Sequence, residues 1–177
     1  MRILGIDPGL NATGFGVIST EPAGQLRALT AGVIRPLHRQ PLSRRLRMLY
    51  DGLLEVIRAY RPGIVVLEAV YTHHEYKTTA ALMAHARGVA CLVAAQHDLP
   101  VVDYLPTRVK KSLTGHGAAS KDQVARMVAM WLNGAEHSWS LDATDALALA
   151  ITHAHVAEHE LAAVPRSHRI ARVSAPS

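Results

Sequence analysis

The stretch RILGIDPGLNATGFGVI, which spans residues 2–18, decides the fold class of this 177-residue chain. An apolar run ends at Asp7, and Pro8 and Gly9 then supply a turn before a second apolar run. A third run, over 26–34, follows after another turn. Three short apolar runs with turn residues between them, and no helical periodicity, predict an antiparallel meander of three strands.

The hydrophobic period changes downstream of the meander. From Ser43 the apolar residues recur at three or four positions, which predicts a helix that ends before Pro62. A β-branched run over 63–68 is typical of a strand covered on both faces, and an alanine-rich helical pattern follows over 78–96. This order predicts an α/β fold in which helices flank a mixed five-stranded sheet. The remaining expected elements are a strand over 101–105, a helix opened by a capping box at Ser120 and Gln123, and a helix over 141–161.

Length and composition fit a single globular domain. Apolar residues make up 49% of the chain, which argues against general disorder, and no apolar run approaches the roughly 20 residues needed to cross a bilayer. Asp7 and Pro8 break the first apolar run before it could form the core of a signal peptide, and the single cysteine, Cys91, fits a reducing compartment. We expect one α/β domain over residues 1–163, a basic and disordered tail over 164–177, no membrane association and a cytoplasmic location.

Basic residues are concentrated in two blocks that contain no acid. The chain has 19 Lys and Arg residues against 14 Asp and Glu residues, for a net charge of +5. Either block alone is compatible with a solvated face, but two blocks favour a polyanion such as nucleic acid, bound more weakly as salt rises. The block over 35–47 holds Arg35, Arg39, Arg44, Arg45 and Arg47, and the block over 104–121 holds Arg108, Lys110, Lys111 and Lys121.

Four acids lie at the ends of apolar runs and have no basic neighbour in sequence. Removal of an ionised carboxylate from water without a partner is costly, so a compensating cation is expected. Asp142 and Asp145 are three residues apart, which on a helix places two like charges on one face. A divalent cation turns this repulsion into coordination, and carboxylates alone suit Mg²⁺ or Mn²⁺, whereas zinc would call for histidine or cysteine. The four candidate metal ligands are Asp7, Glu68, Asp142 and Asp145.

A set of carboxylates that holds paired metal ions indicates phosphodiester hydrolysis, because the ions activate a water and stabilise the leaving oxygen. Most of the acids also have a purely structural explanation. Asp7 before Pro8 is an ordinary turn residue, and Asp142 and Asp145 would stabilise the first turn of a helix through its dipole. Glu68 has no capping role at the end of a strand-like run. The joint pattern favours the metal site.

Several motifs, taken in order, carry a resemblance to a known family. They are Gly5-Ile6-Asp7-Pro8-Gly9, Glu68 after a β-run, Ala86-Arg87-Gly88, Gly115-His116-Gly117 with Ser120-Lys121, and the segment Asp142 to Ala148 with Ile151-Thr152-His153. Together they closely resemble the RuvC family of Holliday junction resolvases over residues 1–158. The resemblance implies a ribonuclease H-like fold, a homodimer, and Mg²⁺- or Mn²⁺-dependent nicking of two opposed strands of four-way junction DNA, with 5′-phosphate ends.

The resemblance also implies roles for individual residues. The family's four metal-binding acids coincide with the four candidate ligands, and two metal ions are expected per active site. Lys110 and Lys121 match basic residues near the scissile phosphate, and Tyr71 matches an aromatic residue that stacks on bases or wedges them open. We expect Arg108 and Lys111, from the same basic block, to contact DNA as well. Partnership with the RuvA and RuvB branch-migration complex follows from the resemblance only.

The sequence departs from the family pattern at three positions. Ala69 stands in place of glutamine and Tyr71 in place of phenylalanine, so base contacts near the crossover are expected to differ. Thr144 stands where alanine is frequent, which should matter little for metal binding. The histidines without a family role, expected to be exposed or hydrogen-bonded rather than ligands, are His73, His74 and His116.

Two other functions are compatible with parts of the sequence. Asp7-Pro8-Gly9 followed by Gly14 and Gly16 is loosely like the phosphate loop of actin and sugar kinases, but that fold normally needs a second lobe, for which 177 residues leave little room. The other alternative is a non-catalytic junction-binding protein on the same fold, and the presence of all four acids argues against it. The sequence therefore predicts a metal-dependent, structure-selective endonuclease.

Overall fold

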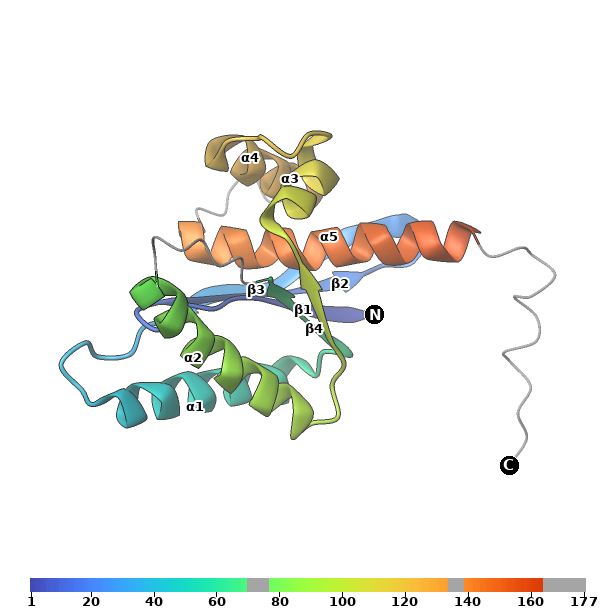
Figure 1. The fold of residues 1–177 in the computed structure, drawn as a ribbon. Coiled ribbons are helices and arrows are strands. Elements are labelled where there is room, and N and C mark those ends of the chain that lie inside the picture. The colour runs from blue at the N-terminus through green and yellow to red at the C-terminus, as the bar shows by residue number, and fades with distance from the viewer. Residues whose placement is uncertain (70–76, 134–138, 164–177) are drawn as a thin grey trace, which may run out of the picture.

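The structure is a computed structural model that describes residues 1–69, 77–133 and 139–163 (Figure 1). The expected tail over 164–177 lies outside this part, as do Tyr71, His73 and His74. No helix within the described ranges is long and apolar enough to cross a membrane. In chain order the elements are β1 (Arg2–Asp7), β2 (Thr13–Thr20), the short helix η1 (Pro22–Gly24), β3 (Leu26–Ile34), α1 (Leu42–Tyr60), β4 (Ile64–Glu68), α2 (Lys77–Ala95), β5 (Val101–Tyr104), α3 (Pro106–Thr114), α4 (Lys121–Trp131) and α5 (Leu141–Ala163).

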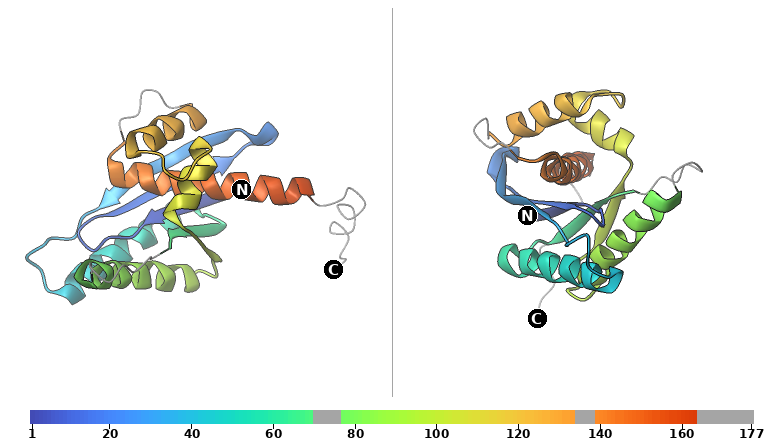
Figure 2. Two further views of the ribbon diagram at one scale, coloured as in Figure 1. Left: turned by 45° about the horizontal axis from the view of Figure 1, so that its top comes forward. Right: turned by 90° about the vertical axis from the view of Figure 1, so that its left-hand side faces the viewer.

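One sheet with the strand order β3-β2-β1-β4-β5 forms the centre of the molecule. β1, β2 and β3 pair antiparallel, as the predicted meander requires, whereas β4 pairs parallel with both β1 and β5. α1 and α2 cover one face of the sheet, and α5 covers the other, with α3 and α4 beyond it (Figure 1 and Figure 2). The predicted α/β architecture with a mixed five-stranded sheet is confirmed.

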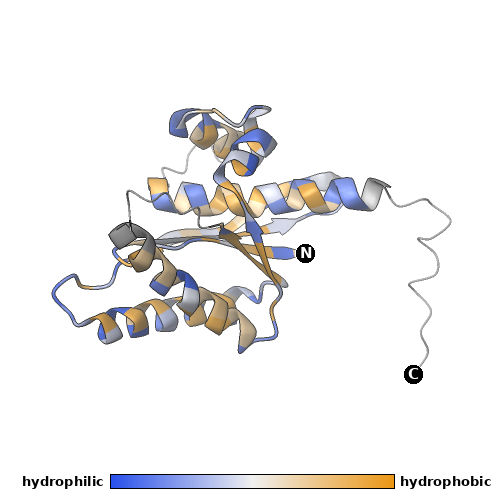
Figure 3. Ribbon diagram, viewed as in Figure 1, coloured by the Kyte–Doolittle hydropathy of each residue, from blue (hydrophilic) through white to orange (hydrophobic). Residues whose placement is uncertain are grey.

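The central strands are buried on both faces, which explains why helices cover the sheet on each side. Leu4 of β1 and Val65 of β4 pack into the core on the side of α1 and α2. Their neighbours Ile3 and Val66 pack into a second core, which includes Ile151 of α5. Hydrophobic residues accordingly follow the strands and α5, and hydrophilic residues mark the outer turns of α3 and α4 (Figure 3).

Glycines let α5 lie directly on β1 and β2. A Cβ atom on Gly5 would lie 2.0 Å from the carbonyl oxygen of Ala146, and one on Gly14 would lie 2.0 Å from that of Asp142. A Cβ atom on Gly16 would lie 2.7 Å from Cδ2 of Leu147. Gly14 and Gly16 are therefore packing residues inside β2 rather than parts of an open phosphate loop. Their small size brings the first turns of α5 against the ends of the strands.

α3 differs from the sequence-based expectation, which placed no helix between the strand over 101–105 and Ser120. The helix begins at Pro106 and ends before Gly115, which has a φ of 86°. Only Val109 and Leu113 are buried on it. One pair of apolar residues is too short a pattern to reveal a helical period, so packing rather than periodicity identifies this element.

Candidate active site

The candidate site lies at one edge of the sheet, where β1 and β4 end. Asp7 is the last residue of β1, and Glu68 is the last residue of β4, its parallel neighbour. Gly14 pairs with Asp7 across the β1–β2 ladder and also packs against the carbonyl of Asp142. The sheet edge and the start of α5, which carries Asp142 and Asp145, therefore meet at this point.

Three of the four candidate acids line one hollow. Asp7, Glu68 and Asp145 face a cavity of about 270 Å³ together with Lys110 and Lys121. Two strand ends and the helices α3, α4 and α5 thus contribute charged groups to the same space. Asp142 does not line this hollow. The apolar part of its wall consists of Pro106, Val109, Val124, Ala148 and Leu149.

Burial and mutual repulsion act on the carboxylates. The pKa of Asp7 is raised to about 7, first by burial and then by the negative charges of the other three acids, whereas Lys121 lowers it. The pKa of Glu68 is also raised, again first by burial and then by Asp145. Both lysines of the hollow oppose the shift at Glu68. The four acids therefore interact electrostatically, and the lysines compensate their charge only in part.

Two of the acids are paired with cations that lie far away in sequence. Lys121 Nζ donates to Asp145 Oδ2 at 3.1 Å, and Arg35 Nη2 donates to Asp142 Oδ2 at 3.2 Å. The lack of a basic neighbour in sequence therefore does not leave either acid without a basic partner in the fold. The cationic side chains are 68% and 58% exposed, respectively. Exposed ion pairs contribute only about 0–1 kcal/mol, so a divalent cation can displace them.

The donor chemistry of the site fits a hard divalent cation. All candidate ligands are carboxylates, and the pKa of Asp7 is raised first by burial and then by the negative charges of the other acids, which Mg²⁺ or Mn²⁺ would compensate. However, no three His, Cys, Asp or Glu side chains in the described part of the chain are arranged as a ready set of metal ligands. Asp145 and Asp142 are instead paired through one carboxylate oxygen each with Lys121 and Arg35.

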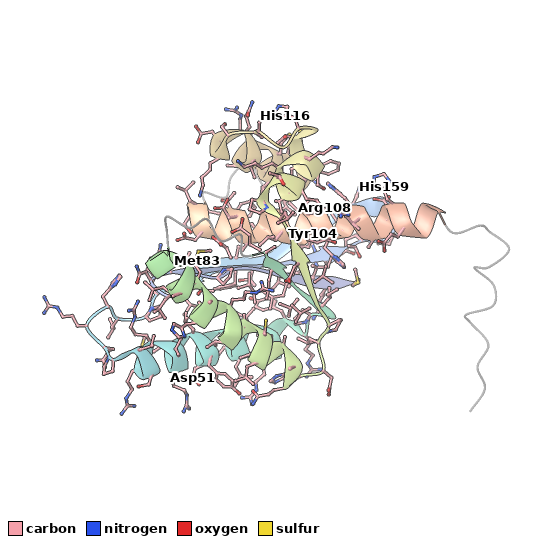
Figure 4. All side chains as sticks on the ribbon, in the orientation of Figure 1. Asp51, Met83, Tyr104, Arg108, His116 and His159 are labelled. Carbon is pink, nitrogen blue, oxygen red and sulfur yellow. The ribbon has the colours of Figure 1, made fainter. Side chains whose placement is uncertain are left out.

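The four cationic side chains of the second basic block lie on different surfaces. Lys110 and Lys121 line the hollow, whereas Lys111 lines a separate hollow between α3, α4 and α5. The Arg108 guanidinium lies over the ring of Tyr104, 5.3 Å from its centre, where β5 leads into α3 (Figure 4). The block therefore contributes two lysines to the site itself and two cations to surfaces beside it.

α4 begins with the predicted capping box. Ser120 Oγ accepts a hydrogen bond from Gln123 N, and Gln123 Oε1 accepts one from Ser120 N. This cap fixes the main chain directly before Lys121. The hydroxyl of the buried Thr144 donates to the carbonyl of Ser140, which directly precedes α5. The Thr144 hydroxyl therefore has a hydrogen-bond acceptor at the start of the helix.

His116 is exposed, as the sequence-based expectation has it. Figure 4 shows it at the outer end of the connection between α3 and α4, away from the sheet. Nothing in this position relates it to the carboxylates at the strand ends.

Three arginines of the first basic block are engaged in contacts within the chain. Arg45 Nη2 donates to the carbonyl of Leu10 at 3.1 Å and to Asn11 Oδ1 at 2.6 Å, which ties α1 to the turn that follows Asp7. Arg47 pairs with Asp51 on the same helix, and Arg35 pairs with Asp142 as described. Arg35 and Arg47 are nevertheless 58% and 73% exposed, so the interpretation of this block as a surface for a polyanion stays a prediction.

Arg87 is a residue near the site to which the sequence assigned no role. It donates to the main-chain carbonyl of Glu68 at 2.9 Å and to Asp103 Oδ2 at 2.6 Å. The only sequence signal for it was its place in the motif Ala86-Arg87-Gly88. Its partners are 19 and 16 residues away, so no local pattern could reveal them.

Comparison with known proteins identifies the family. The family profile described as crossover junction endodeoxyribonuclease RuvC matches residues 3–153. The chain belongs to the RuvC family. The RuvC protein of Rhodopirellula baltica is 43% identical over 159 residues, which cover 90% of this chain and 89% of the relative. That of Myxococcus xanthus is 45% identical over 166 residues, which cover 93% and 84%.

Solved structures of RuvC and of other resolvases share the fold. Thermus thermophilus RuvC in complex with a Holliday junction substrate is 33% identical with a TM-score of 0.84, over 90% of this chain and 96% of that chain. The yeast mitochondrial Holliday junction resolvase Ydc2 has a TM-score of 0.60 over 86% and 77%, and at 12% identity it shows the fold alone. The predicted resemblance to RuvC and the ribonuclease H-like fold are confirmed.

Proposed function

We propose that this RuvC family member is a structure-selective endodeoxyribonuclease that resolves Holliday junctions by hydrolysing phosphodiester bonds. Its family is described as a crossover junction endodeoxyribonuclease, and a solved relative is bound to a Holliday junction substrate. The observation that carries the proposal for this chain is the hollow that gathers Asp7, Glu68 and Asp145 with Lys110 and Lys121. Carboxylates for metal ions beside cations for phosphates suit hydrolysis of a polyanionic backbone.

The proposed cofactor is Mg²⁺ or Mn²⁺, with two ions per active site. Asp7, Glu68 and Asp145 would hold it from the hollow, and Asp142 would join them after Arg35 releases it. When bound, the metal supplies an activated water and compensates the charge on the leaving oxygen. Asp7 must give up its proton to act as a ligand, since its pKa without metal is about 7.

The side chains of the chain itself position the DNA backbone. Lys121 stands at the first position of α4, where its charge adds to the free backbone N–H groups of a helix start. We assign it a phosphate contact that forms once it leaves Asp145. Lys110 adds a second positive charge to the same hollow. Both lysines would thus hold the scissile phosphate against the carboxylates.

Symmetric resolution needs two active sites, and we propose that a homodimer supplies them. A two-fold axis relates two identical sites and so matches two opposed strands of a junction.

The proposed nuclease domain spans residues 1–163, and the proposed basic tail spans residues 164–177. Further proposed DNA contacts are Tyr71, Arg108 and Lys111. The RuvA and RuvB branch-migration complex is the proposed partner, in the cytoplasm, during DNA recombination and repair.

A nicking assay on a synthetic four-way junction tests the function. The purified chain should nick two opposed strands in Mg²⁺ or Mn²⁺, leave 5′-phosphate ends, and leave linear duplex of the same sequence uncut. Asp7→Asn should bind the junction and fail to cut it, because the substitution removes a charge that the metal needs. Metal-dependent binding without nicking by the wild type would favour a non-catalytic junction-binding protein instead.

A further inference from the structure

Arg87 links the main chain at Glu68 to the neighbouring strand. Its side chain comes from α2, on the face of the sheet opposite α5, and is only 21% exposed (Figure 1). Nη1 donates to the carbonyl oxygen of Glu68 at 2.9 Å, and Nη2 donates to Asp103 Oδ2 at 2.6 Å. Asp103 belongs to β5, so the guanidinium joins the end of β4 to β5.

Glu68 lies where the ladder between β1 and β4 runs out. The last pair in that register is Ile6 with Leu67, one residue before Glu68. On the other side, the amide of Ala69 donates to the carbonyl of Tyr104 at 2.9 Å. Strand ends fray unless further contacts hold them. Arg87 supplies such a contact at the carbonyl directly beyond the last β1 pair.

The side chain and the main chain of Glu68 therefore have separate roles. Its carboxylate lines the hollow, and its carbonyl is held by Arg87, which does not line the hollow. The planar arginine fork donates two hydrogen bonds in a fixed geometry that a lysine does not reproduce. The bond to Asp103 fixes one arm of the fork and so directs the other arm at Glu68.

We propose that Arg87 is a positioning residue that fixes the Glu68 carboxylate by holding its main chain. The inference rests on the proposed function, since that function gives the Glu68 carboxylate its role. A misplacement on the order of 1 Å in an active site can cost about 100-fold in rate. Loss of this contact should therefore lower kcat and leave junction affinity nearly unchanged.

Kinetics of substituted proteins test the positioning role. Arg87→Met keeps an apolar stem and removes both donors, and it should lower kcat for junction nicking about 10- to 100-fold while changing the junction Kd less than about threefold. Arg87→Lys keeps the charge and one donor, so it should recover part of kcat. Asp103→Asn keeps an acceptor oxygen and should lose less than Arg87→Met. The matched control is Arg27→Met, which removes an exposed pair with Glu21 and should keep the wild-type kcat.

Amide hydrogen exchange tests the contact without relying on activity. Arg87→Met should speed exchange of the Ala69 amide about tenfold or more, because the strand end loses its tether. The amide of Val65, which donates to the carbonyl of Pro100 at the other end of β4, should exchange at the wild-type rate. Global destabilisation would instead speed both amides together.

The two readouts separate failure of this inference from failure of the proposed function. If the wild type nicks no junction, the proposed function fails, and the exchange at Ala69 still decides whether Arg87 holds the strand end. Unchanged exchange at Ala69 in Arg87→Met overturns the inference whatever the activity. Faster exchange at Ala69 with a wild-type kcat also overturns it, because the tether would then be structural only.

Discussion

Lys121 Nζ lies 3.1 Å from Asp145 Oδ2, so the cation placed to meet a phosphate is paired with a candidate metal ligand. The hydrogen bond to Asp145 is the first cause of the raised pKa of Lys121, followed by the charges of Asp145, Asp7 and Glu68. The same lysine lowers the pKa of Asp7 and Glu68. Without metal, Lys121 thus acts as a counter-ion of the carboxylates, and a divalent cation competes with it for Asp145.

Lys121→Met should bind Mn²⁺ more tightly than the wild type, in the absence of DNA. The competing ion pair is largely exposed and worth less than about 1 kcal/mol, so the metal Kd should fall about two- to fivefold. Nicking of a junction should fall in the same variant, because a phosphate contact is lost. Mn²⁺ titration by calorimetry measures the first effect, with Arg27→Met as the control. Unchanged or weaker metal binding in Lys121→Met would show that the two cations do not compete.

The raised pKa of Asp7 makes the metal-free protein less stable as pH rises. The folded protein retains a proton on Asp7 up to a pKa of about 7, against 3.8 for the solvent-exposed carboxyl in the unfolded chain. Folding therefore favours the protonated form, and stability falls between about pH 4 and pH 7. Asp7→Asn should remove this loss and raise the free energy of unfolding at pH 8 in EDTA by about 2 to 4 kcal/mol.

Urea denaturation of the wild type and Asp7→Asn at pH 4 and pH 8 measures this effect. The difference between the two proteins should be small at pH 4 and large at pH 8. Addition of Mg²⁺ at pH 8 should stabilise the wild type more than the variant. An equal difference at both pH values would mean that Asp7 has an ordinary pKa.

Gly14→Ala should damage both stability and cleavage. Its Cβ would lie 2.0 Å from the carbonyl oxygen of Asp142, so α5 must move away from β2. Overpacking of this kind costs about 1–3 kcal/mol. Gly88→Ala on α2 is the matched control, since a Cβ there meets nothing within 4 Å. That change should stabilise the helix by about 0.5–1 kcal/mol, and equal unfolding midpoints for the two variants would contradict the packing role of Gly14.

Junction affinity should weaken as salt rises. Phosphate contacts release counterions, so a fourfold increase in NaCl should lower the affinity about tenfold or more. Arg35, Arg45 and Arg47 are already engaged in contacts within the chain, so the salt dependence should come mainly from the block over 104–121. Fluorescence anisotropy of a labelled junction at several salt concentrations measures the slope. An affinity that does not change with salt would contradict binding through phosphates.

The fold was largely predictable because its elements carry strong local patterns. The meander, the strand that ends at Glu68 and the alanine-rich helix each follow from hydrophobic period and turn residues. α3 could not be predicted in this way, because only Val109 and Leu113 are buried on it. Glycines such as Gly14 were visible in the sequence, but their purpose depends on α5, which follows them by more than a hundred residues.

The sequence pointed to Asp7, Glu68, Asp145, Lys110 and Lys121, all of which line the hollow, but it did not reveal the ion pairs of the site. Asp7 and Glu68 end apolar strands, and parallel neighbours bring such ends together. The pairing of Lys121 with Asp145 joins residues 24 positions apart, and that of Arg35 with Asp142 joins residues 107 apart. Contacts over such separations depend on tertiary structure, so charge patterns along the chain do not reveal them.

Anomalous diffraction from crystals of the wild type grown with Mn²⁺ tests most directly whether the four carboxylates form one metal site. Manganese peaks should lie between Asp7, Glu68, Asp142 and Asp145, with the Lys121 side chain withdrawn from Asp145. A protein that nicks junctions in Mn²⁺ yet shows its manganese elsewhere, with Lys121 still on Asp145, would contradict it.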